Sequence, residues 1–225
     1  MDLRAWLFSV WAVVRKEAVS ELRLRHGLAI LFLFSAAALL VVLFAVRGQV
    51  RDAGLHAALL WVVLLFSAGN GLGRAFVSEE ERGTVWVLRL HAPASAVYAG
   101  KWLFTLWLSA LVGFASAAVY VLLLGLSVQR PDVFFAVLGL GVVGLSAAMT
   151  LLSALIARTA ARGPLLAVLG FPVLIPVLLA GARGTEQAIR GASFMETSPE
   201  LLALTGYAGA VLAAAFVLFD YVWHE

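Results

Sequence analysis

Long apolar segments without acidic or basic residues dominate the pattern of the chain. The hydrocarbon core of a bilayer is about 30 Å thick and takes roughly 20 helical residues to cross. Six segments come near that length, and Asp220, close to the end of the last one, is the only charged residue inside them. The pattern therefore predicts an all-α integral membrane protein, a single membrane domain over 1–225, with transmembrane helices at 28–46, 57–73, 102–128, 133–157, 165–182 and 201–223.

The distribution of Lys and Arg predicts the orientation of these spans. An even number of spans places both termini on the same side of the membrane, and basic residues are enriched in cytoplasmic segments. Eleven of the sixteen Lys and Arg residues lie in the set formed by the N-terminal segment, the loop 74–101, the loop 158–164 and the C-terminal tail. We therefore expect both termini and the loop 74–101 in the cytoplasm.

The N-terminal segment 1–27 has an amphipathic pattern. Apolar residues recur at helical spacing from Leu3 through Val10 to Ala18, and charged residues occupy mostly other positions. This pattern predicts a helix lying in the cytoplasmic membrane interface, with a packed cytoplasmic helix as the alternative. Gly27 would allow the chain to turn into the membrane.

The fifth apolar segment contains Gly170, Pro172 and Pro176. Each proline removes a backbone donor, so the helix is expected to be kinked or broken there, as suits a moving or pathway-lining helix. Proline is also common in membrane helices without such a role, and this alternative stays open.

The third apolar segment carries small residues every four positions, at Ser109, Gly113 and Ala117. Such a stripe lets another helix approach closely. The neighbouring helix can belong to the same subunit or to a second copy in a homodimer.

Composition agrees with a membrane protein. Hydrophobic residues make up 63% of the chain and charged residues 13%, the mean hydropathy is +1.01, and cysteine is absent. A net charge of +3, with the basic residues scattered between apolar segments, argues against nucleic acid as a partner. The lack of cysteine excludes disulfides, thiol nucleophiles and cysteine-based metal sites.

Several chemistries lack their residues. Proton- or sodium-driven transporters usually carry ionisable side chains at membrane depth, and the predicted spans have none there. An energy-coupled function would therefore need another source of work, and ATP is the obvious one. Because the chain has no phosphate-binding loop, ATP would bind to a partner. The chain also has no H-E-x-x-H, and we expect neither a catalytic residue nor a metal site. Four histidines lie at span ends or in loops, where each is an ordinary interfacial residue or a single haem ligand: His26, His56, His91 and His224.

The loop 74–101 joins an acidic run at 79–81 to an apolar stretch at 85–88. An amphipathic helix of this kind can dock into a groove on a cytosolic partner, with the flanking charges fixing the register. The alternative is a loop whose apolar half lies on the lipid headgroups.

This loop resembles the signature of the CcmB family, haem exporter protein B. The family's pattern R-x-F-x-x-E-x-x-x-G-T, an apolar stretch ending in proline, and G-K is filled here by Arg74, Phe76, Glu79, Gly83, Thr84, Pro93, Gly100 and Lys101. The segment 171–176 resembles the paired-proline segment of the family's fifth span. Trp86, where members often have an acidic residue, and His91, in an otherwise aliphatic stretch, depart from the pattern.

The resemblance implies a six-span, ABC-2-like permease subunit of the bacterial cytoplasmic membrane. Its partners would be the ATPase subunit CcmA, CcmC, the small CcmD and, indirectly, the periplasmic haem chaperone CcmE, with a homodimer inside the complex. ATP would be bound by the partner, and its hydrolysis would be linked to haem export or to release of the haem-loaded chaperone. Haem would be a possible transported cargo, and no bound cofactor is expected. The residues expected to contact the ATPase are Arg74, Phe76, Glu79, Glu80, Glu81, Arg82, Gly83, Thr84 and Pro93.

Two alternatives remain from the sequence. The first keeps the ABC-2-type permease and changes its cargo to a lipid, a glycan or a drug. The second is a membrane-embedded enzyme or an assembly scaffold without an ATPase partner.

Overall fold

The computed structural model describes residues 2–24, 26–46, 52–71, 75–157, 159 and 162–224. Within these residues the chain is helical and has no strands. The helices are α1 (Leu3–Leu24), α2 (His26–Val46), α3 (Ala53–Gly71), α4 (Val77–Arg82), α5 (Val85–His91), α6 (Ala94–Leu124), α7 (Pro131–Ile156), α8 (Arg162–Arg190) and α9 (Ser198–His224). The all-α prediction is confirmed.

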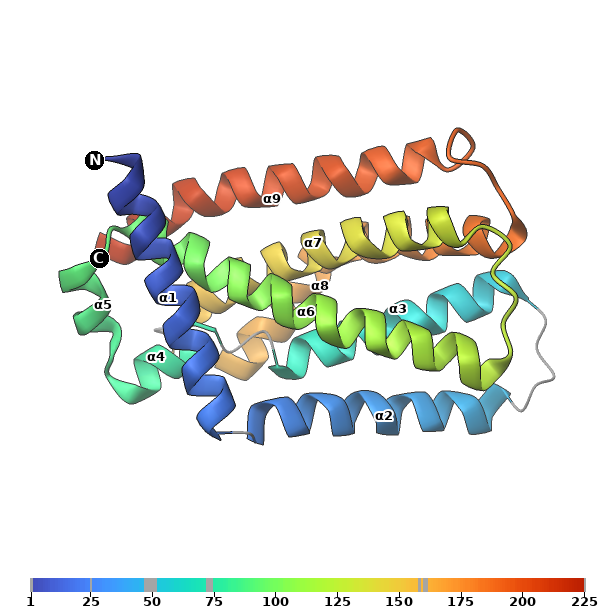
Figure 1. Ribbon diagram of the computed structural model, residues 1–225, viewed down its shortest axis with the longest axis horizontal. Helices are drawn as coiled ribbons and strands as arrows, with labels where there is room; N and C mark the ends of the chain where they lie inside the picture. Colours follow the sequence, from blue (N-terminus) through green and yellow to red (C-terminus); the bar gives the residue numbers. More distant parts are fainter. Residues whose placement is uncertain are drawn as a thin grey trace.

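The long helices run lengthwise in one bundle, with α1 crossing them at one end (Figure 1). Both termini, α4 and α5 lie at that same end, which we call the terminal end of the bundle. The connections between α6 and α7 and between α8 and α9 lie at the opposite end. The terminal end therefore gathers the N-terminal segment and the loop 74–101, which the sequence places on one side of the membrane.

Four helices are long and apolar enough to cross a membrane: α6, α7, α8 over Pro164–Arg190 and α9 over Ser198–Tyr221. They match the last four predicted spans. Among the described residues, α2 and α3 contain the shorter apolar stretches Leu31–Val46 and Ala53–Ala68. The chain is thus a multi-pass membrane protein.

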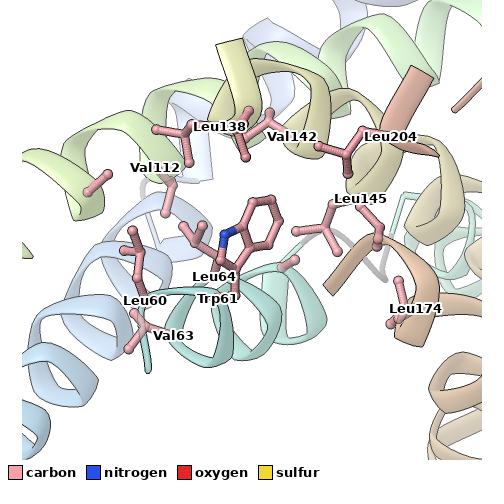
Figure 2. Close-up of a cluster of buried hydrophobic side chains, with 14 of the residues drawn as sticks. Leu60, Trp61, Val63, Leu64, Val112, Leu138, Val142, Leu145, Leu174 and Leu204 are labelled. Atoms are coloured by element: carbon pink, nitrogen blue, oxygen red, sulfur yellow. The ribbon is translucent and has the colours of Figure 1, made fainter. Parts of the chain in front are cut away.

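A tryptophan of α3 sits at the centre of the bundle. Figure 2 shows the Trp61 indole surrounded by buried side chains of α3, α6, α7, α8 and α9. A Cβ added at Gly141 of α7 or at Gly181 of α8 would overlap the ring. The indole Nε1 donates to Thr185 Oγ1 over 2.9 Å, so the only polar atom of the ring is satisfied. Two glycines therefore create the space that lets three helices meet around one large side chain.

The small-residue stripe of α6 is packed inside the subunit. Ser109 and Ala117 are buried, and a Cβ at Gly113 would lie 3.1 Å from Val142 Cγ2 of α7. The structure favours packing within one subunit, the first of the two alternatives for this stripe.

Helix α8 is continuous through both of its prolines, so it is not broken at Pro172 and Pro176, and a kink there stays a prediction. A proline ring displaces carbonyls of the preceding turn. The Tyr207 hydroxyl of α9 donates to the Val173 carbonyl over 2.6 Å, three residues before Pro176. A side chain of the neighbouring helix thus supplies a partner in the turn that the proline disturbs.

Helix α1 combines the two predicted environments. Val10 and Val13 are buried against α6, and the Trp6 Nε1 donates to Ser95 Oγ over 3.1 Å. Six of its large apolar side chains are exposed: Leu3, Leu7, Phe8, Trp11, Val19 and Leu22. Gly27 already lies inside α2, so the predicted turn at that residue is wrong.

Candidate functional site at the terminal end of the bundle

A left-handed glycine joins the two short helices of the loop 74–101. Gly83 has φ +66° and follows α4, and its N–H donates to the Glu80 carbonyl over 3.2 Å. The Thr84 N–H donates to the Glu79 carbonyl over 3.1 Å. No atom lies within 4 Å of a Cβ built at Gly83, so backbone conformation and not space selects glycine here. The predicted tight bend between the charged and apolar halves is confirmed.

Glu79 is the centre of a buried group of charges. Only 3% of the residue is exposed, and its carboxylate faces Lys101 Nζ of α6 at 3.2 Å. Lys101 Nζ also contacts Glu17 Oε1 of α1 at 2.8 Å, and Lys16 of α1 pairs with Glu79. We call Lys16, Glu17, Glu79 and Lys101 the ion cluster.

The ion cluster is electrically balanced and well supplied with hydrogen bonds. Lys101 Nζ donates to the Ala75 carbonyl over 2.7 Å, and Thr84 Oγ1 donates to Glu79 Oε2. Burial alone would raise the pKa of Glu79, but the charge of Lys101 and the hydrogen bonds from Lys16 and Thr84 outweigh burial and lower that pKa to about 2. Glu79 is therefore ionised at neutral pH. Its ion pairs tie α4 to α1 and α6.

Phe76 anchors the start of α4 to the bundle. Its N–H donates to Ser153 Oγ of α7 over 2.9 Å, and its ring lies 4.9 Å from Phe219 of α9 between centroids. Lys101 Nζ lies 5.1 Å from the centroid of the same ring, a cation–π distance. The beginning of α4 thus touches α6, α7 and α9 at once.

Helix α5 exposes an apolar surface. Trp86 is 66%, Val87 58% and Leu90 81% exposed, and no residue of α5 is buried. Arg89 fixes this helix to the bundle, because its guanidinium lies 5.2 Å from the Trp86 ring and 5.3 Å from the Trp223 ring of α9. Helix α5 is therefore held at its base and open on its outer face.

The residues predicted to contact a partner differ in exposure. Phe76 and Glu79 are buried, whereas Glu81, Arg82 and Gly83 are exposed, and Glu80, Thr84 and Pro93 are intermediate. Arg82 Nη1 donates to Ser20 Oγ of α1 over 3.0 Å. Arg74 lies outside the described residues.

Sequence reasoning missed the partners of Glu79. Lys16 and Glu17 are among the charged residues outside the apolar stripe of the N-terminal segment, yet Glu17 lies four residues after the buried Val13 and on the same face. The sequence singles out Lys101 only as part of the Gly100-Lys101 pair of the family pattern, and not as a partner of Glu79. A Cβ at Gly100 would lie 2.7 Å from Val13 Cβ, so this glycine lets α1 approach α6.

Among the histidines whose side chains the structure describes, His56 is buried, although it lies at the span end where the sequence places it. His56 lies in α3, is 5% exposed, and its Nδ1 is 3.1 Å from the Tyr120 hydroxyl of α6. His91 Nδ1 lies 2.8 Å from the Val87 carbonyl of its own helix. In the part of the chain that the structure describes, no three His, Asp or Glu side chains gather as a metal site.

Comparison with known proteins adds one finding. The sequence model of a family described as CcmB protein matches residues 8–220, nearly the whole chain. The search of curated proteins gave no significant match.

Proposed function

Because the chain belongs to the CcmB family, we propose that it couples ATP hydrolysis by a separate subunit, CcmA, to haem export or to release of the haem-loaded chaperone CcmE. Family membership makes the chain an ABC transporter permease subunit of cytochrome c maturation. The coupling route, the remaining partners CcmC and CcmD, and a homodimer inside the complex are parts of the proposal. The observation that carries it is a helix, α5, that is apolar outside and anchored to the bundle at its base.

The proposal includes six spans with both termini in the cytoplasm of a bacterium. Helices α2 and α3 have 21 and 19 residues. At 1.5 Å per residue these lengths correspond to about 30 Å, the thickness of a bilayer core. Basic residues are concentrated in the segments at the terminal end, which supports a cytoplasmic position for that end.

The outer face of α5 supports contact with the ATPase. Three large apolar side chains exposed on two helical turns form a surface that a protein partner can cover. Glu81 and Arg82 lie beside it on α4 and supply charges that can fix the register of docking. Trp86, one of the two departures from the family pattern, is one of the three apolar residues.

The attachments of α4 and α5 support transmission of movement. Any displacement of α4 acts on the ion cluster, and through Glu17 and Lys101 it reaches α1 and α6. A displacement of α5 acts through Arg89 on Trp223 at the end of α9. A push on this segment therefore acts on three helices of the bundle.

Co-purification from a bacterium with a cytochrome c maturation system tests the docking surface. The variant is Trp86→Glu/Leu90→Glu, and the matched control is Phe194→Glu/Met195→Glu, which changes two exposed apolar residues at the opposite end. We expect the first variant to lose the ATPase subunit and the control to keep it. Retention of the ATPase by the first variant would show that the outer face of α5 is not the docking surface.

A further inference from the structure

A basic pocket lies between α1 and α4, beside the ion cluster. It has a volume of about 480 Å³ and is lined by Lys16, Val19, Ser20, Arg23 and Arg82. The four α1 residues stand at i, i+3, i+4 and i+7, so they form one stripe of the helix. Arg82 faces them from α4, and its hydrogen bond to Ser20 Oγ holds the two helices together.

The lining of the basic pocket carries positive charge without a carboxylate. Lys16 is partly neutralised, because its amine pairs with Glu79 and lies 3.3 Å from Glu17 Oε1. Arg23 and Arg82 are exposed and, among the described residues, have no ion pair with a carboxylate. Two guanidinium groups and a hydroxyl are suited to the oxygens of a phosphate group.

The surroundings of the basic pocket are those of a membrane interface. Val19 lines the pocket and is 45% exposed, and Leu22 on the same helix is 61% exposed. Phe8 and Trp11 continue this exposed apolar surface toward the start of α1. Because α1 crosses the ends of the long helices (Figure 1), its exposed apolar side chains lie where acyl chains meet headgroups.

We propose that the basic pocket binds the headgroup phosphate of an anionic phospholipid. Arg23 and Arg82 hold the phosphate oxygens, Ser20 and Lys16 complete the site, and the acyl chains lie along Val19 and Leu22. The lipid joins α1 to α4 next to Glu79 and so stabilises the position of the loop 74–101. This inference depends on the membrane location of the protein and not on the coupling route or the cargo.

Native mass spectrometry of the full-length chain in mild detergent tests the site. Dioleoyl phosphatidylglycerol or dioleoyl phosphatidylcholine is added, and the lipid-bound fraction is measured for the native chain and two variants. Arg23→Gln/Arg82→Gln removes the two guanidinium groups of the pocket. Arg4→Gln/Arg15→Gln removes two exposed charges of α1 outside it. Thermal unfolding of each variant shows whether it is folded.

We expect the native chain to prefer phosphatidylglycerol. A basic residue near an anionic lipid contributes about fivefold in affinity, so the pocket variant is expected to bind phosphatidylglycerol roughly 25-fold more weakly and the control to bind it normally. Equal binding of the two lipids by the native chain, or equal losses in the two variants, would overturn the proposal.

Two further measurements separate the lipid from other anions. Glycerol 1-phosphate, which has the headgroup chemistry without acyl chains, should fail to displace phosphatidylglycerol at tenfold excess; displacement would show a site for a soluble phosphate. Co-purification of the ATPase should be the same for Arg23→Gln, which spares Arg82, as for the native chain. If only the pocket variant loses the ATPase and its lipid binding is normal, the pocket is a protein contact and the lipid site is wrong. If the pocket variant does not fold, the native chain alone tests the proposal. It should prefer phosphatidylglycerol to phosphatidylcholine, and glycerol 1-phosphate should not displace the lipid.

Discussion

Lys101 and Glu79 form an ion pair of 3.2 Å between two nearly inaccessible side chains, one on a transmembrane helix and one in the loop 74–101. Charges removed from water are stable only when they are paired and hydrogen-bonded. Here the pair is completed by Glu17, Lys16, Thr84 and a backbone carbonyl. The pair therefore fixes the loop to the membrane domain at one defined position.

Removal of the lysine alone should be strongly destabilising. Lys101→Met leaves Glu17 and Glu79 without their buried counter-charge, and breaking a buried pair in this way costs about 3–5 kcal/mol. Thermal unfolding in detergent measures the loss. The double variant Lys101→Met/Glu79→Gln should regain a substantial part of it. A single variant as stable as the native chain would show that the pair does not hold the loop.

The contribution of Glu79 to the stability of the fold should decrease as the pH is lowered. Its pKa is lowered from 4.5 to about 2 in the folded chain, so the ionised carboxylate stabilises the fold. This contribution is complete above about pH 4.5 and is lost as the pH falls toward 2. Thermal unfolding at pH 7, 5, 4 and 3 should show the stability difference between the native chain and Glu79→Gln shrinking only below pH 4.5. A difference that is constant down to pH 3 contradicts the assignment.

Gly100 should tolerate no side chain. In Gly100→Ala the new Cβ would lie 2.7 Å from Val13 Cβ and 3.0 Å from the Val10 carbonyl oxygen, so α1 would be pushed away from α6 at a cost of about 1–3 kcal/mol. Gly139→Ala is the control, since no atom lies within 4 Å of its Cβ. Protease accessibility of α1 should rise in Gly100→Ala and not in the control. Val13→Ala in the Gly100→Ala background removes the Cγ1 contact at 2.8 Å but keeps Val13 Cβ, so it should restore only part of the protection.

Because of Trp61, a methyl group added at Gly181 of α8 should destabilise the bundle. Gly181→Ala places a Cβ in overlap with the indole, and Gly206→Ala on α9 places one in open space. We expect the first variant to unfold at a clearly lower temperature and the second to be unchanged. Trp61→Phe in the Gly181→Ala background should recover stability, although it loses the hydrogen bond to Thr185. Failure of this rescue would show that the indole does not set the helix spacing.

Sequence predicted the elements built from long apolar runs and missed those built on paired charges. The third predicted span begins at residue 102, because Lys101 is charged, whereas α6 begins at Ala94. Glu17 and Glu79 neutralise Lys101, and both are distant in sequence. Likewise α8 continues past residue 182 to Arg190, where Glu186 and Arg190 pair at 2.7 Å.

The candidate site was predictable in its location but not in its inner contacts. The acidic run, the bend at Gly83 and the apolar stretch at 85–88 indicated a short amphipathic segment, and the structure forms α4 and α5 there. The family pattern singles out Glu79 among the three glutamates at 79–81, but it does not indicate which of these carboxylates is buried. In the structure it is Glu79, which pairs with Lys16 of α1 and Lys101 of α6.

The absence of cysteine makes one measurement especially direct. Single cysteines are introduced at Trp86 and Leu90 on α5 and, as controls, at Phe194 and Met195 at the opposite end, and a short thiol-to-amine crosslinker is added to membranes that contain the whole complex. If α5 couples the ATPase to the bundle, both α5 cysteines crosslink to the ATPase subunit, the controls do not, and ATP changes the yield. Crosslinking from the controls alone, or no crosslink from α5, would contradict this account.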